Sequence, residues 1–479
     1  MRHDRKSTLF LLGILFGSCA YAQLYDLPDF GSPADAIMTI SEERQLGRSI
    51  YSQILASNTI FEHPILDEYI QSLGSNIAVY AQDGDFSFNF FIINDPEVNA
   101  FALPGGFIGI HTGLIEQTTL ESELAGVLAH EIAHVTQRHI SRSYLEQQKG
   151  SMIALATMIA GAILSGMSNS SDAATGALMA GQSAMQQGQI NFTRAMEIDA
   201  DRVGVQTLHD SGYDPLGMPS MFEKISRLFT NTQRAIPEFL QTHPVTATRI
   251  SETRSRANSL NGIYKTNTES YEIVKAIITY NDFRTPGEAK LFFESNLLSQ
   301  GETIGSLYGA ILACIEVDAL SEANSYLNKI KSINSNLIAV TDLEVKLLVA
   351  QNKSEQAVTL LTNNLRVTPR NPTLVNSLAS IYMAEENPNK AHELMLDLLN
   401  NMPARPYQIM SLATYAQSMG DEPLSHYYLA EYYISLRNLR DAEVQLNIAL
   451  SDTSLEPTNR DKYQARLEQV QEALAPAER

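Results

Sequence analysis

The pattern of apolar and polar positions in the first half of the chain predicts both strands and helices. A strand is predicted from Ser87 to Ile93. Polar and aromatic residues alternate at its start, and an apolar run follows them. A second apolar stretch extends from Asn99 to His111 and contains Pro104, Gly105 and Gly106, which indicate a turn. We expect this half of the chain to fold as a mixed α and β domain.

Two helices are predicted after these strands. The first begins near Thr119, because Thr118 and Glu121 stand at the spacing of a capping box, and it continues through His134. The second extends from about Phe192 to Leu208. Both carry polar residues at helical spacing among apolar ones, so each is expected to bury one face.

The segment between the two helices has an unusual composition. Residues 152–167 are apolar, but about 20 residues are needed to span a membrane, so a spanning helix is not expected. Residues 168–188 are small and polar, which is typical of a mobile connection. Several methionines fall between Met152 and Met196. A lid, a flap that touches a membrane, and loose core packing remain open interpretations.

A sequence pattern repeats every 34 residues in the second half of the chain. In each repeat a small residue is followed four positions later by an apolar residue. The small residues are Ala289, Ala323, Ala357, Ala391 and Ser425, and the apolar residues are Phe293, Leu327, Leu361, Met395 and Leu429. This period, with a small residue where two helices cross, is typical of tetratricopeptide repeats. We predict an all-α solenoid over residues 263–479; the alternative is a set of generic helical hairpins.

The net negative charge of the chain limits the kinds of molecule that it is expected to bind. The chain has 479 residues, with 54 acidic against 34 basic residues and a net charge of −20. Phosphate binding needs a basic face, so nucleic acid is excluded as the main partner. The composition also shows no polybasic membrane anchor.

The N-terminal residues have the features of an export signal. A basic start is followed by an apolar run from Leu9 to Phe16 and by the small-residue cleavage site Ala20 to Ala22. We predict a signal peptide over residues 1–22, cleaved after Ala22. Cleavage removes Cys19 and leaves Cys314 as the only cysteine, so no internal disulfide is expected.

One segment carries the residues of a zinc site. His130, Glu131 and His134 follow the spacing His-Glu-x-x-His within the first predicted helix. Positions i and i+4 share a helix face, so both imidazoles can bind a single zinc ion. Glu131 is the candidate catalytic base, because a carboxylate beside the metal can take a proton from bound water. The alternative is a helix that happens to carry two histidines.

A catalytic zinc site needs a third protein ligand. His139 is excluded, because at about 100° per residue it is rotated away from the face of His130 and His134. The second predicted helix offers Glu197 and Asp201, four positions apart. Glu197 reaches further and is the candidate ligand. Asp201 is a second candidate catalytic residue, which would accept a ring N–H from a ligand histidine and fix its tautomer. The alternative is an acidic helix surface.

The stretch from Asn99 to Ile110 is expected to form an edge strand beside the zinc. Such a strand can hold an extended substrate by main-chain hydrogen bonds, with Asn99, Ala100 and Phe101 as the candidate residues. An ordinary hairpin explains the pattern equally well.

Taken together, these motifs resemble one family. The sequences HEIAH and EIDAD, with NAFALPGGFIGIHTGLI upstream, are similar to the HtpX-like zinc metallopeptidases, which include the CAAX prenyl proteases. The family's HExxH and later ExxxD map onto His130, Glu131, His134, Glu197 and Asp201 without gaps. The export signal and the repeat array make the chain similar to the periplasmic branch of this family.

The resemblance implies a fold and a role that composition and spacing do not. It implies an α+β zincin-like metallopeptidase domain over residues 23–262, with one zinc ion per chain, located in the periplasm. Unfolded or misassembled outer-membrane β-barrel proteins are the implied substrates. The implied partners are the barrel-assembly machinery and the lipopolysaccharide-transport barrel. A peripheral contact with the membrane is a separate expectation, which comes from the flap interpretation of the segment between Met152 and Met196.

His243 stands before a proline and allows two interpretations. Pro244 fits the first position of a helix, so His243 or Thr242 caps that helix in one of them. In the other, the His243 imidazole occupies the fourth position on zinc, displaces the catalytic water and keeps the enzyme inactive. The resemblance supports the second.

The motifs and the family resemblance together imply two alternative functions. The first is a periplasmic zinc endopeptidase with a chaperone-like scaffold that degrades or assists misassembled β-barrel proteins. The alternative is a mostly latent scaffold for the barrel-assembly machinery, because a repeat array presents a concave groove to partners. The intact motif from His130 to His134, together with Glu197, favours an active enzyme.

Overall fold

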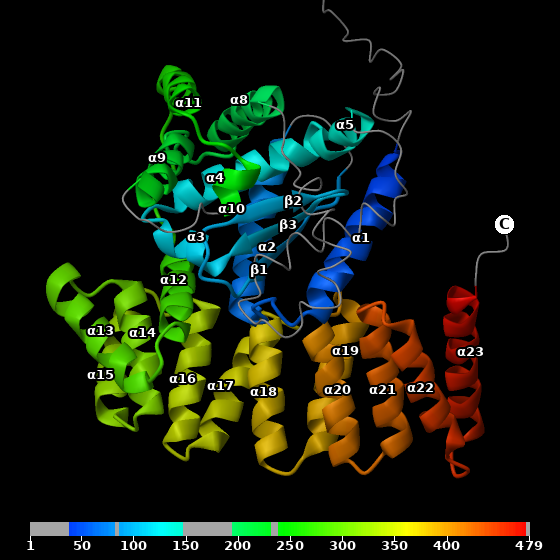
Figure 1. Ribbon diagram of the computed structural model, residues 1–479. Helices are drawn as coiled ribbons and strands as arrows, with labels where there is room; N and C mark the ends of the chain where they lie inside the picture. Colours follow the sequence, from blue (N-terminus) through cyan, green and yellow to red (C-terminus); the bar gives the residue numbers. More distant parts are fainter. Residues whose placement is uncertain (1–37, 82–85, 147–193, 231–237, 476–479) are drawn as a thin grey trace, which may run out of the picture.

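The chain folds into a mixed unit of strands and helices that lies against a long row of helices. The computed structural model describes residues 38–81, 86–146, 194–230 and 238–475. Strands and helices up to Ser259 form the mixed unit, and the later helices form the row along one side of it (Figure 1). The predicted fold class, an α+β domain followed by an all-α solenoid, is confirmed.

The mixed unit contains three strands, which form a single sheet, and the helices around it. Its elements are α1 (Ile40–Ala56), α2 (Pro64–Ala78), β1 (Asn89–Ile93), β2 (Ala100–Leu103), β3 (Phe107–His111), α3 (Thr112–Gln117), α4 (Glu121–Thr136), α5 (His139–Glu146), α8 (Arg194–Asp210), α9 (Gly217–Thr230), α10 (Glu238–Thr242) and α11 (Ala247–Ser259).

The sheet has the order β1-β3-β2, with β1 parallel and β2 antiparallel to β3. The strand predicted from Ser87 begins at Asn89. The predicted turn lies between β2 and β3, where Gly105 and Gly106 have φ values of 74° and 94°. Glycine adopts this left-handed region without the steric cost that a Cβ atom brings.

Helices cover both faces of the sheet. Alternate residues of a strand point to opposite faces, and here both sets are buried. Phe90 and Ile92 belong to a large core that includes α2 and α4, whereas Phe91 and Ile93 pack in a smaller core with α1. The sheet therefore separates α1 from the helices that carry the candidate site.

Helix α4 is buried along its whole length, and its start differs from the prediction. It begins at Glu121, and the carboxylate of Glu123 accepts the backbone N–H groups of Thr119 at 2.7 Å and Leu120 at 3.2 Å. The predicted capping pair of Thr118 and Glu121 is wrong, because both side chains bond to the row of helices instead. The second predicted helix is α8, which the structure describes from Arg194.

The row consists of six consecutive helical hairpins. Its helices are α12 (Glu269–Asn281), α13 (Pro286–Gln300), α14 (Ile304–Glu316), α15 (Leu320–Ile333), α16 (Ile338–Ala350), α17 (Ser354–Val367), α18 (Pro372–Ala384), α19 (Pro388–Asn401), α20 (Pro406–Ser418), α21 (Glu422–Ser435), α22 (Leu439–Ser451) and α23 (Pro457–Leu474).

The small residues at the 34-residue spacing lie on the second helix of successive hairpins, and all of them are buried. Ser425 shows why the position must be small, because its hydroxyl donates to the carbonyl oxygen of Ala413 on the preceding helix at 2.9 Å. The predicted repeat pattern is therefore confirmed in these hairpins.

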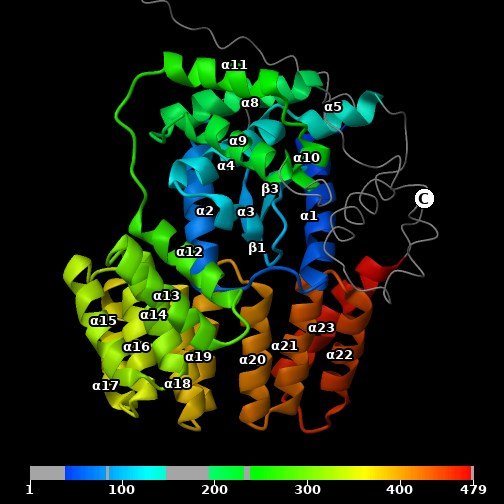
Figure 2. The same ribbon diagram turned by 60° about the vertical axis from the view of Figure 1, so that its left-hand side comes forward.

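Helix α12 joins the row to the mixed unit. The hydroxyl groups of Thr118 and Tyr271 are 2.7 Å apart, and the carboxylate of Glu121 accepts the backbone N–H of Thr268 at 2.7 Å and the hydroxyl of Tyr69 at 3.1 Å. One hydrophobic core continues across this junction. In both views, α12 lies where the two parts meet (Figures 1 and 2). The predicted boundary at residues 262 and 263 falls between α11 and α12 and stays a prediction.

Some predicted segments lie outside the described residues. These are the signal peptide over residues 1–22 and the connection over residues 152–188, with every methionine of that region except Met196. Within the part of the chain that the structure describes, no helix combines the length and the apolar character needed to cross a membrane.

Candidate metal centre

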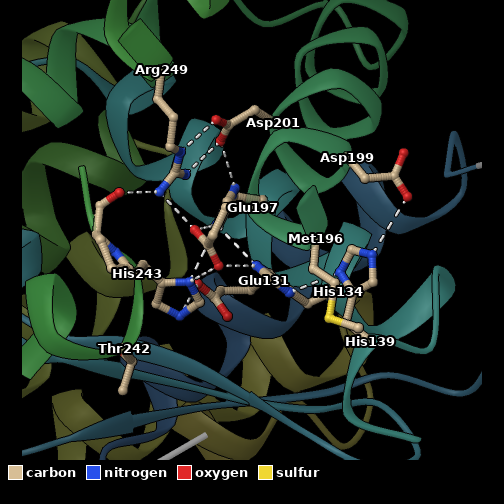
Figure 3. Close-up of polar contacts among 12 residues, drawn as sticks. Glu131, His134, His139, Met196, Glu197, Asp199, Asp201, Thr242, His243 and Arg249 are labelled. Carbon is tan, nitrogen blue, oxygen red and sulfur yellow. Dashed lines mark hydrogen bonds and ion pairs between the residues drawn. The ribbon is translucent and has the colours of Figure 1, made fainter. Parts of the chain in front are cut away.

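Helix α4 brings two imidazoles together on the face that it turns toward α8. His130 and His134 are one helical turn apart and fully buried, and their Nε2 atoms lie 3.0 Å apart. The Nδ1 atom of each ring therefore points away from the other ring, toward a separate partner. Figure 3 shows His134 beside its partner, His139.

Helix α8 crosses α4 and adds two carboxylates. The carboxylate oxygens of Glu197 lie 3.4 Å from Nε2 of His134 and 3.6 Å from Nε2 of His130. Asp201, one turn later, lies 3.1 Å from Nδ1 of His130. Gly204 permits the close crossing, because a Cβ atom there would lie only 3.1 Å from a backbone oxygen of α4.

A third imidazole comes from the segment between α10 and α11. His243 is buried, and its Nδ1 atom lies 3.0 Å from Oε1 of Glu197 and 3.4 Å from Nε2 of His130. Its Nε2 atom lies 3.7 Å from Oε1 of Glu131. One nitrogen of the ring therefore faces the other converging side chains and the other faces Glu131, and His243, Glu197 and Glu131 lie close together in Figure 3.

The interpretation of His243 or Thr242 as a helix cap is wrong. The backbone N–H of His243 donates to the carbonyl of Phe239 at 2.7 Å, which ends α10. The next helix, α11, begins only at Ala247, and the hydroxyl of Thr246 accepts the N–H of Arg249 at 3.2 Å. Pro244 therefore lies outside both helices.

The four converging side chains fit a bound metal ion. One ligand atom from each of His130, His134, Glu197 and His243 lies within 4.8 Å of the other three. Tetrahedral zinc with bonds of about 2.0–2.1 Å places its ligand atoms about 3.3 Å apart. The separations given above range from 3.0 to 3.6 Å. Imidazole nitrogens and a carboxylate are also the donors that zinc prefers in proteins.

The electrostatics of the metal-free cluster favour a bound cation. Burial opposes a charged His130, but the contacts with Asp201 and Glu197 outweigh it and raise its pKa to about 9. Burial lowers the pKa of His134 well below its usual value. Burial also opposes a charged Glu197, but His243 and the two α4 histidines hold its pKa well below the usual range. The cluster thus keeps a carboxylate ionised and attracts a positive charge beside it.

Glu131 follows His130 on α4 and faces His243 and the sheet. Its carboxylate is fully buried, and burial raises its pKa. His243, His130 and the backbone N–H of Ala102 on β2 act in the opposite direction. A raised carboxyl pKa suits a group that exchanges a proton near neutral pH.

Arg249 on α11 is a component of the site that the sequence analysis missed. Its Nε and Nη2 atoms donate to the two oxygens of Asp201 at 2.7 Å each, and Nη1 lies 2.7 Å from Glu197. Nη1 also donates to the carbonyl of Pro244 at 2.9 Å. A bidentate pair of this kind compensates the buried carboxylates. Its spacing gave no signal, because Asp201 is 48 residues away.

His139 lies beside His134 although it is not one of the converging ligands. Arg138 has a φ of 53°, so the chain turns there and His139 begins α5 instead of extending α4. Its Nδ1 atom lies 3.0 Å from Nδ1 of His134, and its Nε2 atom lies 3.5 Å from Oδ2 of Asp199. The rotation argument that excluded His139 as a ligand missed this contact, because that argument assumed one continuous helix.

The candidate substrate strand lies next to the same site. Ala100 and Phe101 belong to β2, which forms one edge of the three-stranded sheet described here and packs against α4. Asn99 precedes the strand, and its carbonyl accepts the N–H of His111 at 3.0 Å. All three candidate side chains are buried, so a partner would meet the main chain of this edge.

Comparisons with known proteins agree with this geometry. A model of "Peptidase family M48" matches residues 64–257. The "Beta-barrel assembly-enhancing protease" of Escherichia coli K12 is 31% identical over 95% of this chain and 93% of its own length. The protein of the same name from Yersinia pestis is 31% identical over 93% and 91% of the two chains. A "Putative beta-barrel assembly-enhancing protease" of Vibrio cholerae is 39% identical over 48% of this chain and 47% of its own.

Proposed function

The chain belongs to peptidase family M48, and on this premise we propose that it is a periplasmic zinc endopeptidase acting on misassembled outer-membrane β-barrel proteins. It is a metalloprotease of the class that its HExxH motif predicted. Beyond membership of the family, we propose which metal the chain binds, which substrate it cuts, where it is located and what single residues do.

We assign zinc to His130, His134 and Glu197. The observation that carries this assignment is the convergence of two buried Nε2 atoms and a carboxylate at the separations expected around tetrahedral zinc. Zinc, when bound, supplies a Lewis acid that lowers the pKa of a coordinated water toward about 7. Asp201 orients the ring of His130, since it lies at Nδ1, on the side of the ring away from the cluster.

Glu131 is assigned as the general base rather than as a ligand. The Glu131→Gln variant is expected to retain zinc and to lose about 10²- to 10⁴-fold in peptide hydrolysis, because the amide cannot accept the proton. Initial rates of cleavage, measured beside the metal content, test this. A variant with full zinc and the wild-type rate would remove Glu131 from the reaction.

The substrate is proposed to bind as an extended strand along the edge of β2. The support is the position of β2 at a sheet edge, packed on α4, with the backbone of Ala102 beside Glu131. Main-chain pairing reads little side-chain sequence, which suits an enzyme that acts on many misassembled proteins.

Cleavage of a β-barrel protein presented in two states tests the substrate class. The purified mature chain is expected to cut the unfolded barrel and to leave the same barrel intact once it is folded in detergent. Glu131→Gln serves as the inactive control. Equal cleavage of both states, or of neither under conditions where an unrelated unfolded protein is cut, would contradict the proposed substrate.

His243 is proposed to keep the enzyme latent. Its Nδ1 atom lies 3.0 Å from Glu197 and 3.4 Å from His130, and its Nε2 atom faces Glu131, so the ring would bind as a fourth ligand in place of a metal-bound water. The His243→Ala variant is expected to raise proteolysis, including self-cleavage, with unchanged zinc content. His209→Ala, outside the cluster on α8, is the matched control. Unchanged activity in a folded His243→Ala protein would contradict the latency role.

The position of His243 also favours the second candidate function, a mostly latent scaffold. In that case the row of helices would hold partners, for which the sequence resemblance suggests the barrel-assembly machinery and the lipopolysaccharide-transport barrel. Complementation of a deletion strain separates the two functions. If the protein acts only as a scaffold, Glu131→Gln should restore barrel assembly fully. If proteolysis is required, the same variant should fail to clear misassembled barrel proteins.

A further inference from the structure

The two histidines of the HExxH motif have different partners at Nδ1, the ring nitrogen that points away from the cluster. Nδ1 of His130 lies 3.1 Å from a carboxylate, that of Asp201. Nδ1 of His134 lies instead 3.0 Å from Nδ1 of a second imidazole, His139, whose Nε2 atom lies 3.5 Å from Asp199 (Figure 3). Because α8 carries both Asp199 and Asp201, one helix supports the two histidines, one directly and one through His139.

We propose that His139 is a positioning residue, which accepts a hydrogen bond from Nδ1–H of His134 and thereby holds the His134 ring with Nε2 directed at the metal position. A nitrogen-to-nitrogen hydrogen bond contains a single proton, so one ring must donate and the other accept. Binding through Nε2 requires the proton of His134 to be on Nδ1. His139 then carries its own proton on Nε2, which faces Asp199. The inference rests on the proposed zinc function.

The fold fixes His139 in this position from both sides. The left-handed Arg138 directs the chain from α4 into α5, and its side chain is buried against α1. Nε of Arg138 donates to Glu43 at 2.9 Å, and the hydroxyl of Ser141 also contacts Glu43. The α1 helix thus clamps the turn that aims His139 at His134.

Asp199 is held at the other end of this chain of contacts. Arg202, one turn later on α8, donates to Asp199 at 3.0 Å, and Arg142 of α5 lies 4.0 Å away. His139 itself is fully buried, so its ring is held between Asp199 and His134.

Zinc affinity, measured by competition with a chromogenic chelator, tests the role quantitatively. His139→Leu keeps the volume but removes the acceptor, and it is expected to weaken zinc binding about 10- to 100-fold. His139→Gln keeps an acceptor oxygen and is expected to recover most of the affinity. His209→Ala is the matched control on α8, because its ring contacts Tyr264 and not the cluster, and its affinity should equal that of the wild type.

A spectroscopic measurement distinguishes positioning from packing. In the zinc-loaded chain with ¹⁵N-labelled histidine, we expect a coupling between the Nδ1 atoms of His134 and His139 across their shared proton. That coupling should vanish in His139→Gln even if the affinity recovers. Its absence in the wild type would overturn the proposal, as would a folded His139→Leu with wild-type affinity.

A second variant keeps the test valid if His139→Leu does not fold. Asp199 is partly exposed, and Asp199→Leu removes the carboxylate that lies 3.5 Å from Nε2 of His139 without changing the core. A reduced zinc affinity is expected, with recovery in Asp199→Asn, whose amide oxygen still accepts. Wild-type affinity in a folded Asp199→Leu protein, together with no coupling between His134 and His139 in the wild type, would reject the role of His139. A wild-type chain that binds no zinc would reject the proposed function instead.

Discussion

Arg249 is buried between Asp201 and Glu197, and its removal would leave both carboxylates without the guanidinium that pairs with them. Arg249→Met is expected to lower the free energy of unfolding of the metal-free protein by about 3–5 kcal/mol, because breaking a buried ion pair leaves an uncompensated charge. Denaturant unfolding in the presence of a chelator measures this loss.

Arg254 on the same helix provides the control for Arg249. Its side chain is 42% exposed and pairs with Glu223 at 2.6 Å. Exposed pairs contribute about 0–1 kcal/mol, so Arg254→Met should change the unfolding free energy by no more than that. Equal losses in the two variants would show that the buried network does not stabilise the site as described.

The sequence identified most residues of the candidate site, but not all of them. The helical period and the motif identified His130, Glu131, His134, Glu197 and Asp201 as candidates. His243 was proposed from its place before Pro244 and from the family resemblance, and the structure brings all six residues to one place. The sequence did not identify Arg249 because its contact with Asp201 depends on tertiary packing. It did not identify the role of His139 because that contact depends on a left-handed turn at Arg138, which no periodic pattern encodes.

At the scale of elements, the start of α4 depends on one carboxylate. Glu123 accepts two backbone N–H groups, the hydroxyl of Ser220 at 2.7 Å and the ammonium of Lys224 at 2.6 Å. Glu123→Ala is expected to cost about 2–3 kcal/mol of stability, since a charged acceptor and a helix cap are lost together. Thermal unfolding with and without added zinc measures the effect on the helix that carries the histidines.

An exposed acidic residue controls for the general effect of removing charge from a first helical turn. Glu355 occupies such a position in α17 and is exposed. Glu355→Ala should change the stability by less than about 1 kcal/mol. If Glu123→Ala were as mild as this control, the capping role assigned to Glu123 would be wrong.

The elements themselves could largely be predicted from periodicity. The three strands, α4, α8 and the hairpins of the row all follow apolar patterns that match their structure. The start of α4 was misplaced because Thr118 and Glu121 look like a capping pair locally. Their side chains are instead bonded by Tyr271 and Thr268, which lie about 150 residues away in sequence and which local spacing cannot reveal.

At the scale of the whole molecule, two acidic residues meet where the row joins the mixed unit. Burial and a hydrogen bond with Asp282, after α12, raise the pKa of Glu116 in α3 to about 8. A carboxyl with a raised folded-state pKa stabilises the fold fully below its unfolded value, near 4.5, and this stability is lost as pH rises toward 8.

Glu116→Gln removes this titration and should flatten the pH dependence. The wild type is expected to lose melting temperature between pH 5.5 and 8.5 relative to this variant, which keeps a hydrogen-bonding group at the junction. Calorimetry at both pH values measures the difference. Parallel changes in the two proteins would show that the Glu116 contact does not link the two parts in a pH-dependent way.

The two-part fold could be predicted from the sequence, but the way the parts join could not. The 34-residue period identified the row, and the mixed pattern before it identified the α+β unit. The continuous core at α12 rests on pairs such as Thr118 and Tyr271, which are 153 residues apart. Such pairs follow from packing, not from any pattern within either part.

The metal content of three purified mature proteins tests the central claim most directly. After expression with zinc and removal of loose metal, mass spectrometry should find one zinc ion per chain in the wild type and in Glu131→Gln. Glu197→Ala should retain far less, because it loses one of three protein ligands. Undiminished zinc in a folded Glu197→Ala protein, or no zinc in the wild type, would contradict a catalytic centre built on His130, His134 and Glu197.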